Sequence, residues 1–185
     1  AIASQVVAQA EAKAQAYQDR KTEVEKAAVE YRASEIQKET TEIREKAIEA
    51  AKKKKEEEAR KAEEERVAAR QEVTDFAVQF VGNPYVWGGT SLTNGADCSG
   101  FTMSVFAQFG YSLPRTAAAQ YEASNKKDIS QLETGDLVFY GAGGINHVAL
   151  YIGNGKIVHA SGAATGIKIS DYNYETPVGI GSYMK

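Results

Sequence analysis

Apolar residues recur at helical spacing in the first part of the chain and at strand spacing near its end. Between Val7 and Tyr31, eight positions alternate steps of three and four, and seven of them are apolar. This periodicity is typical of a coiled-coil seam, although its many alanines make the interface weak. The positions are Val7, Ala10, Ala14, Tyr17, Lys21, Val24, Ala28 and Tyr31. Between Lys52 and Arg66 the seam disappears, and opposite charges four positions apart indicate a solvated helical spacer.

Composition changes sharply near residue 75. The sixteen glycines, three prolines, six phenylalanines and single tryptophan all lie from Phe76 onward, whereas the first 75 residues hold 34 of the 47 charged residues. Such a segment cannot form a compact core, but it can form one continuous helix of about 110 Å. We therefore expect a helical coiled coil over residues 1–75 and a globular domain over residues 76–185.

In the globular domain the hydrophobic period changes from helical to alternating. Helices are expected at 73–81, at 101–109 before Gly110, and from Thr116 to about Tyr121. Strands are expected at 137–140, 147–152 and 156–160. The last two strands, joined by Gly153-Asn154-Gly155, form an antiparallel hairpin. The pattern therefore predicts an α+β domain.

Cys98, the only cysteine, lies in Ala96-Asp97-Cys98-Ser99-Gly100 at the start of a predicted helix. The unpaired N–H groups and the helix dipole there favour a thiolate, which predicts a pKa lowered from about 8.5 toward roughly 3.5–7.5. The only histidines, His147 and His159, follow on predicted strands. One thiol and two imidazoles can supply a nucleophile, a base, and a group that orients the base. The alternative is a small buried cysteine with two structural histidines.

The hairpin loop decides whether the two histidines can cooperate. A two-residue Asn-Gly loop would pair Leu150 with His159 and place the imidazoles on opposite faces. A three-residue loop, with Gly155 at positive φ as a glycine bulge, would pair Ala149 with His159 and place both rings on one face. We favour the second arrangement because glycine occupies both ends of the loop. We also expect Cys98 to pack against that face.

Charge and residue inventory exclude several other functions. The net charge is −3 and no run of eighteen apolar residues occurs, so we expect neither a nucleic-acid partner nor a transmembrane segment. One cysteine with two histidines leaves a tetrahedral zinc site one ligand short unless a carboxylate joins, and we expect no metal and no cofactor. The start at Ala1 without a methionine suggests a processed N-terminus, and no signal peptide is visible.

Five motifs follow one another between Phe76 and Lys185. They are Pro84-Tyr85-Val86-Trp87-Gly88-Gly89, Asp97-Cys98-Ser99-Gly100-Phe101, Leu113-Pro114-Arg115-Thr116, Gly135-Asp136-Leu137-Val138-Phe139 and the segment 147–155. In this order they resemble the NlpC family of bacterial cell-wall cysteine peptidases. The resemblance implies a papain-like core, in which the helix that carries the nucleophile packs on an antiparallel sheet. It also implies cleavage of peptidoglycan stem peptides, between D-isoglutamate and a diamino acid.

The same resemblance assigns roles to single residues. Cys98 is the nucleophile, His147 is the general base, and His159 orients His147 by accepting a hydrogen bond. The backbone N–H of Cys98 is a natural oxyanion donor, and the hydroxyl of Tyr85 would help to position substrate or oxyanion. Tyr85 is otherwise a core tyrosine, and its loop is otherwise a turn with a core tryptophan, Trp87.

Three polar residues near the nucleophile are candidates for binding substrate. Asp97 would contact an amide or amine, or would only cap the helix. Arg115 would pair with the α-carboxylate of isoglutamate, or would only hold its loop. Ser99 belongs to the same candidate site.

The sequence therefore predicts a cysteine D,L-endopeptidase that hydrolyses peptidoglycan. Its coiled coil is similar to that of secreted Gram-positive enzymes, which predicts a location in the cell wall or outside the cell. Two alternatives remain: another acyl transfer on the same core, such as an amidase, transpeptidase or thioesterase, and a non-catalytic cell-wall-binding protein. Residues 1–75 contain no histidine or cysteine. We expect them to limit access to the cleft through self-association or docking over it, and a membrane-bound regulatory protein to release this block.

Overall fold

The computed structural model describes residues 2–185. It contains two compact units, one ending at Arg60 and the other spanning Lys61–Lys185. Helix α1 spans Ile2–Val78, so the division falls inside a continuous helix. The second unit therefore begins well before residue 76, where the change of composition placed the domain boundary.

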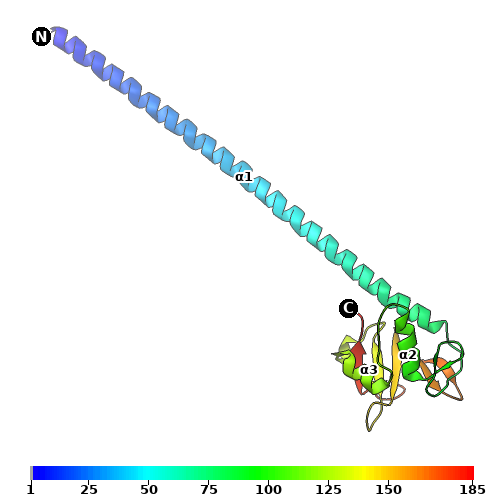
Figure 1. Ribbon diagram of the computed structural model, residues 1–185. Coiled ribbons are helices and arrows are strands. Elements are labelled where there is room, and N and C mark those ends of the chain that lie inside the picture. The colour runs from blue at the N-terminus through cyan, green and yellow to red at the C-terminus, as the bar shows by residue number, and fades with distance from the viewer. Residues whose placement is uncertain (1) are drawn as a thin grey trace. The chain divides into compact units, whose positions relative to one another are not determined.

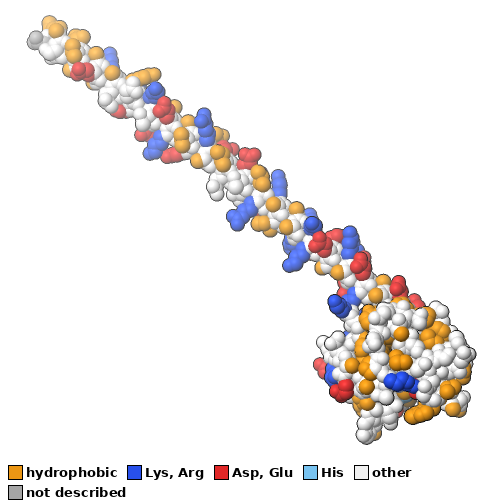
Figure 2. All heavy atoms as spheres, viewed as in Figure 1, with side chains coloured by type: hydrophobic (Ala, Val, Ile, Leu, Met, Phe, Trp, Pro, Cys, Tyr) orange, Lys and Arg blue, Asp and Glu red, His pale blue; other side chains and the backbone are white. Residues whose placement is uncertain are grey.

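The first unit consists of helix α1 alone. Every side chain from residue 2 to residue 60 is exposed, including apolar ones of the predicted stripe such as Tyr17 and Val24. Side chains of both charges follow one another along it (Figure 2), and Lys52 pairs with Glu56 one turn away. The helical prediction for this segment is confirmed, and the partner of its apolar stripe stays a prediction. In the described part of the chain, no helix combines the length and apolar character needed to cross a bilayer.

The second unit places three helical segments and eight short strands after the end of α1. The helices are α2 (Cys98–Ala107), α3 (Ala117–Ala123) and the 3₁₀ turn η1 (Ile129–Gln131). Strands β1 (Thr90–Ser91) and β2 (Gly95–Ala96) form a small ribbon. The main sheet contains β3 (Asn125–Lys127), β4 (Leu137–Tyr140), β5 (His147–Gly153), β6 (Lys156–Gly162), β7 (Gly166–Asp171) and β8 (Gly179–Ser182). It is antiparallel throughout, in the order β3-β8-β4-β5-β6-β7.

Side chains of the sheet alternate between two apolar clusters, one on each face. Leu137 and Phe139 of β4 enter the larger cluster with Phe101 and Phe106 of α2, so this helix covers that face (Figure 1). The intervening Val138 and Tyr140, together with Ala149 of β5 and Ile157 of β6, form the smaller cluster on the opposite face. The sheet is thus buried on both sides at β4, where all four residues are buried.

The last turns of α1 belong to the core of the second unit. Val73 and Ala77 are fully buried in the larger cluster, and the ring of Phe76 meets that of Phe109 edge-on. Because these residues lie on a helix that begins far upstream, the separate helix expected at 73–81 is instead the end of α1, which gives way to turns after Val78.

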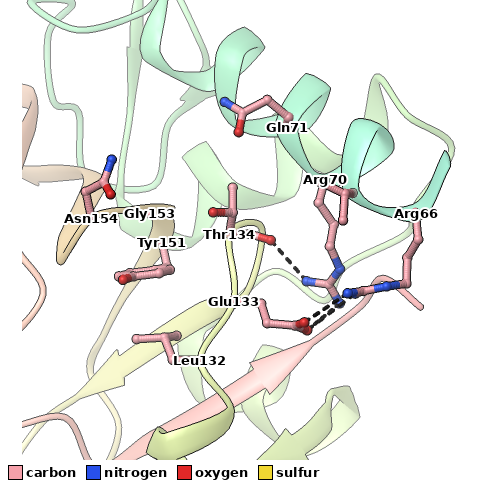
Figure 3. Close-up of a pocket in the computed structure, with 10 residues that line it drawn as sticks. Arg66, Arg70, Gln71, Leu132, Glu133, Thr134, Tyr151, Gly153 and Asn154 are labelled. Atoms are coloured by element: carbon pink, nitrogen blue, oxygen red, sulfur yellow. Dashed lines mark hydrogen bonds and ion pairs between the residues drawn. The ribbon is translucent and has the colours of Figure 1, made fainter. Parts of the chain in front are cut away.

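A buried arginine attaches this end of α1 to two distant parts of the chain. Arg70 is 4% exposed and donates to a carboxylate oxygen of Asp136 at 2.9 Å, to the carbonyl of Thr134 and to the hydroxyl of Ser182. Its guanidinium also reaches the carbonyl oxygens of Met184 and Lys185. Figure 3 shows Arg70 beside Arg66, whose guanidinium pairs with Glu133.

The predicted elements of the globular domain largely agree with the structure. The three expected strands are confirmed as β4, β5 and β6, and the expected helices after Asp97 and Thr116 are confirmed as α2 and α3. Sequence reasoning missed β1, β2, β3, β7 and β8. Most of these strands have two to four residues, too few for a clear alternation of apolar and polar positions.

We predict that Arg70→Ala destabilises the second unit by about 3 kcal/mol, because it leaves the buried carboxylate of Asp136 with Lys127 as its remaining ion-pair partner. The matched control is Lys156→Ala, which breaks an ion pair with Asp171 whose side chains are both about half exposed or more, and should cost less than about 1 kcal/mol. Urea unfolding followed by near-ultraviolet circular dichroism reports on the second unit. Equal losses in the two variants would contradict the prediction.

Candidate active site

Cys98 is the first residue of α2, and Asp97 is its N-cap. The carboxylate of Asp97 accepts hydrogen bonds from the backbone N–H of Gly100 at 2.8 Å and of Gly88 at 2.9 Å. A side chain at Gly100 would collide with the carbonyl oxygen of Gly89, so the start of α2 lies directly against the glycine loop. The capping role considered for Asp97 is confirmed, and it fixes the backbone on both sides of the thiol.

Arg115 completes the shell around this cap. Its guanidinium makes two hydrogen bonds to Asp97, at 2.6 and 2.9 Å, and a third to the hydroxyl of Ser99 at 3.1 Å. Burial works to raise the pKa of Asp97, but the hydrogen bonds from Arg115 and from Gly100 and Gly88 outweigh it and lower the pKa. The side chains of Asp97 and Arg115 therefore bind each other, which agrees with the alternative in which Arg115 holds its loop.

The two histidines share one face of the β5–β6 hairpin. Leu150 lies opposite Val158, and this register places Ala149 opposite His159, as the favoured arrangement required. Nε2 of His147 lies 2.7 Å from Nδ1 of His159. The predicted contact between the rings is therefore confirmed.

The hairpin has this register, but its loop is shorter than expected and its bulge lies elsewhere. Asn154 and Gly155 both have positive φ, at 52° and 74°, and form a two-residue turn between Gly153 and Lys156. The extra residue lies before the turn, because the register shifts between Tyr151 and Gly153. Positive φ at Gly155 is confirmed, but the bulge is in β5 and not at the loop.

Burial in an aromatic environment keeps both imidazoles neutral. The ring of His147 meets that of Tyr140 at 5.9 Å, and the ring of His159 meets that of Tyr174 at 5.5 Å. Burial lowers the pKa of His147 to about 4. Burial, and then the charge of His147, lower the pKa of His159 to about 3. At neutral pH each ring therefore carries one N–H and one acceptor nitrogen.

Cys98 lies at the beginning of β5, an inner strand of the sheet. Alternation along β5 and β6 places His147 and His159 on the side of the smaller cluster, whereas α2 covers the other face. The expectation that Cys98 packs against the face of the histidines is therefore wrong. Its sulfur instead meets the backbone where β5 begins, 4.0 Å from the carbonyl oxygen of Asn146 and within reach of the N–H of Val148.

The expected lowering of the Cys98 pKa is also contradicted. Burial raises the pKa of the thiol, and the negative charge of Asp97 adds to this effect. Hydrogen bonds from the backbone of Val148 and Ser99 act in the opposite direction but are outweighed. The resting site therefore holds a neutral thiol and a neutral imidazole, since desolvation disfavours both ions.

A cleft of about 430 Å³ opens over the sulfur. Four of the predicted site residues line it, namely Cys98, Asp97, Ser99 and Arg115. Tyr85 is half-buried and does not line this cleft, and burial followed by the charges of Cys98 and Asp97 raises its pKa. A second hollow of about 350 Å³, at the end of α1 (Figure 3), contains none of the predicted site residues.

Sequence reasoning missed several residues of this site. Trp87 lines the cleft and is 87% exposed, so the alternative that made it a core tryptophan is wrong. Ile145 and Asn146, just before the predicted base, line the same cleft. Trp87 had a usable signal, because it lies in a glycine-rich loop that offers little to bury it. Tyr174 had none, because the loop that brings it to His159 follows a strand that was not predicted.

Comparisons with known proteins fit this arrangement. The model of the NlpC/P60 family matches residues 82–178. Peptidoglycan endopeptidase RipB of Mycobacterium tuberculosis strain H37Rv is 39% identical over 121 residues, covering 57% of this chain and 50% of that protein. Gamma-D-glutamyl-L-lysine dipeptidyl-peptidase of Bacillus subtilis strain 168 is 40% identical over 103 residues, covering 54% and 34%. This chain thus spans half or less of the length of these curated relatives.

Solved structures resemble the second unit as well. The NlpC/p60 domain of the peptidoglycan hydrolase SagA is 36% identical with a TM-score of 0.55, and the match covers 60% of this chain and 95% of that one. An NlpC/P60 family protein from Bacillus cereus is 32% identical with a TM-score of 0.60, covering 63% of this chain and 40% of the other.

We predict that the buried histidines make stability depend on pH. A histidine held at a pKa of about 3 in the folded state binds fewer protons than it does unfolded, near 6.5, so stability falls as pH decreases from about 6.5. Between pH 7 and 5, His159 should account for a loss on the order of 2 kcal/mol. His159→Gln, which does not titrate, should unfold in urea with a flatter dependence on pH. Parallel curves for wild type and variant would contradict a buried neutral His159.

Proposed function

This chain belongs to the NlpC/P60 family, and we propose that its second unit is a cysteine endopeptidase that hydrolyses the stem peptides of peptidoglycan. One observation carries the proposal: a single thiol at a helix N-terminus lies at the backbone of the strand that starts with a paired histidine. This arrangement has the three groups that thiol acyl transfer requires.

In the proposed reaction, His147 takes the proton of Cys98 while the sulfur attacks the carbonyl carbon of the substrate. The backbone N–H of Cys98 and the hydroxyl of Tyr85 stabilise the oxyanion of the tetrahedral intermediate. The intermediate collapses to a thioester, and His147 gives its proton to the leaving amine. Water then attacks the thioester, with His147 again acting as base, and the thiol is restored.

The neutral resting pair sets the order of these events. Because burial disfavours both the thiolate and the imidazolium, forming the two ions before the attack on the carbonyl would cost free energy. The imidazolium is then stabilised by His159, which accepts from its second nitrogen. Proton transfer therefore coincides with attack on the carbonyl, and we assign no free thiolate to the resting enzyme.

The cleft itself suggests how a stem peptide binds. The indole of Trp87 and the side chain of Ile145 offer apolar surface next to Cys98. Asp97 and Arg115 neutralise each other in a bidentate pair, so we assign them to the shape of the cleft, with Ser99 as their partner. We propose cleavage between D-isoglutamate and a diamino acid, supported by relatives named as a gamma-D-glutamyl-L-lysine dipeptidyl-peptidase and a DL-endopeptidase.

Substrate class also suggests where the protein works and how it is regulated. We propose a location in the cell wall or outside the cell of a Gram-positive bacterium. The exposed apolar stripe of residues 7–31 offers a surface for self-association or for a regulatory protein. Self-association would limit access of cross-linked peptidoglycan to the cleft, and pairing with a regulatory protein would release it.

We predict that Cys98→Ser folds normally and loses at least about 10³-fold in cleavage rate, because a serine hydroxyl does not readily form an anion. His147→Ala should lose about 10²–10⁴-fold, since it removes proton transfer. His159→Ala should keep measurable activity, because His159 only orients the base.

Mass spectrometry of muropeptides released from peptidoglycan gives both the rate and the bond cleaved. Near wild-type turnover in Cys98→Ser would overturn the assignment, and an amidated or transferred product would favour another acyl transfer.

We predict that a chain beginning at Lys61 cleaves a soluble stem peptide several-fold faster than the full chain. This start keeps Arg70, whereas a start near Glu72 would remove it and disturb the second unit. Sedimentation of both chains measures whether residues 2–60 cause self-association. Equal rates would rule out a role of the helix in limiting access, and would leave it as a spacer or a localisation element.

A further inference from the structure

The bond between the two histidines has two possible directions. A neutral imidazole has one N–H and one acceptor nitrogen, so either His147 Nε2 donates to His159 Nδ1 or the reverse. Only the first direction leaves Nδ1 of His147 with a lone pair. In the second direction Nδ1 of His147 already carries a proton and the lone pair of the ring is at Nε2, so Nδ1 cannot accept a proton from Cys98.

The direction is decided at the far nitrogen of His159. Nε2 of His159 lies 3.0 Å from Oγ of Ser170, on the neighbouring strand β7. If Ser170 accepts from Nε2–H, then Nδ1 of His159 is unprotonated and accepts from His147. If Ser170 donates, the whole chain of hydrogen bonds reverses. The direction of the hydrogen bond at the hydroxyl of Ser170 therefore decides whether Nδ1 of His147 has a lone pair and can act as a base.

The surroundings of His159 leave its tautomer to these two partners. The side chain is 1% exposed, so bulk water does not reach its ring nitrogens. Rings of Tyr174 and Tyr140, 5.1 Å apart, cover the pair. Ser170 is half-buried, so its hydroxyl can donate a hydrogen bond to solvent while its oxygen accepts one from the imidazole.

We propose that Ser170 is a positioning residue: it accepts a hydrogen bond from Nε2–H of His159 and thereby holds His147 as the tautomer with a free Nδ1. When Nδ1 takes the proton of Cys98, the charge of the imidazolium is stabilised along Nε2–H of His147, His159 and Ser170. Ser170 touches neither the thiol nor the substrate in this role. The inference rests on the proposed function only for its effect on rate.

The tautomers can be measured directly, because the chain has only two histidines. The full chain is labelled with ¹⁵N-histidine, and long-range ¹H–¹⁵N correlation at neutral pH reports which ring nitrogens carry protons. Expected are Nε2–H on both rings. In Ser170→Ala, His159 should populate both tautomers, and kcat should fall about tenfold with KM within about twofold, as expected for loss of one hydrogen bond in a buried site. Ser170→Thr keeps the hydroxyl and should restore both readouts.

The matched control is Ser130→Ala, which removes an exposed hydroxyl in η1 and should change neither readout. Protonation of His159 at Nδ1 in the wild-type chain, or unchanged tautomers in Ser170→Ala, would overturn the role of Ser170. Failure of the wild-type chain to hydrolyse peptidoglycan would overturn the proposed function instead. The ring-nitrogen signals need no substrate and would still decide for or against Ser170.

Discussion

The buried ion pair between Arg70 and Asp136 holds together three parts of the second unit that are far apart in sequence. Arg70 comes from the end of α1, Asp136 precedes β4, and the same guanidinium binds Ser182 and the carbonyl of Met184 at the C-terminal end. A buried guanidinium needs acceptors for its donors, and here three separate segments of the chain supply them. The second unit therefore includes helix residues that have the composition of the coiled coil.

This pair positions the active site indirectly, through the sheet. Asp136 leads directly into β4, and β4 is hydrogen-bonded to β5, where Tyr140 lies opposite His147. Residues of α1 and α2 meet in the larger apolar cluster, which fixes the helix that begins with Cys98. The thiol thus lies at the backbone where β5 begins, and His147 is the first residue of the same strand.

Burial has contrasting effects within the site. At Asp97 it is outweighed by Arg115 and two backbone N–H groups, so the carboxylate stays charged and serves as a structural cap. At Cys98 and His147 no full opposite charge compensates it, and both groups are neutral. In the proposed reaction the proton leaves Cys98 only as the sulfur attacks, so the ions in the cleft are Asp97 and Arg115 and not the reacting groups.

The sequence alone determined the long helix, the position of Cys98 at a helix start, the three central strands and the family to which the chain belongs. These properties depend on local composition, period and motif order, which are readable without long-range contacts. Tertiary structure decided where α1 enters the core, that the bulge lies in β5, that Trp87 is exposed, and that Ser170 meets His159. It also reversed the expected shift of the Cys98 pKa. Desolvation and hydrogen bonding depend on which distant residues surround a group, and that information is absent from spacing along the chain.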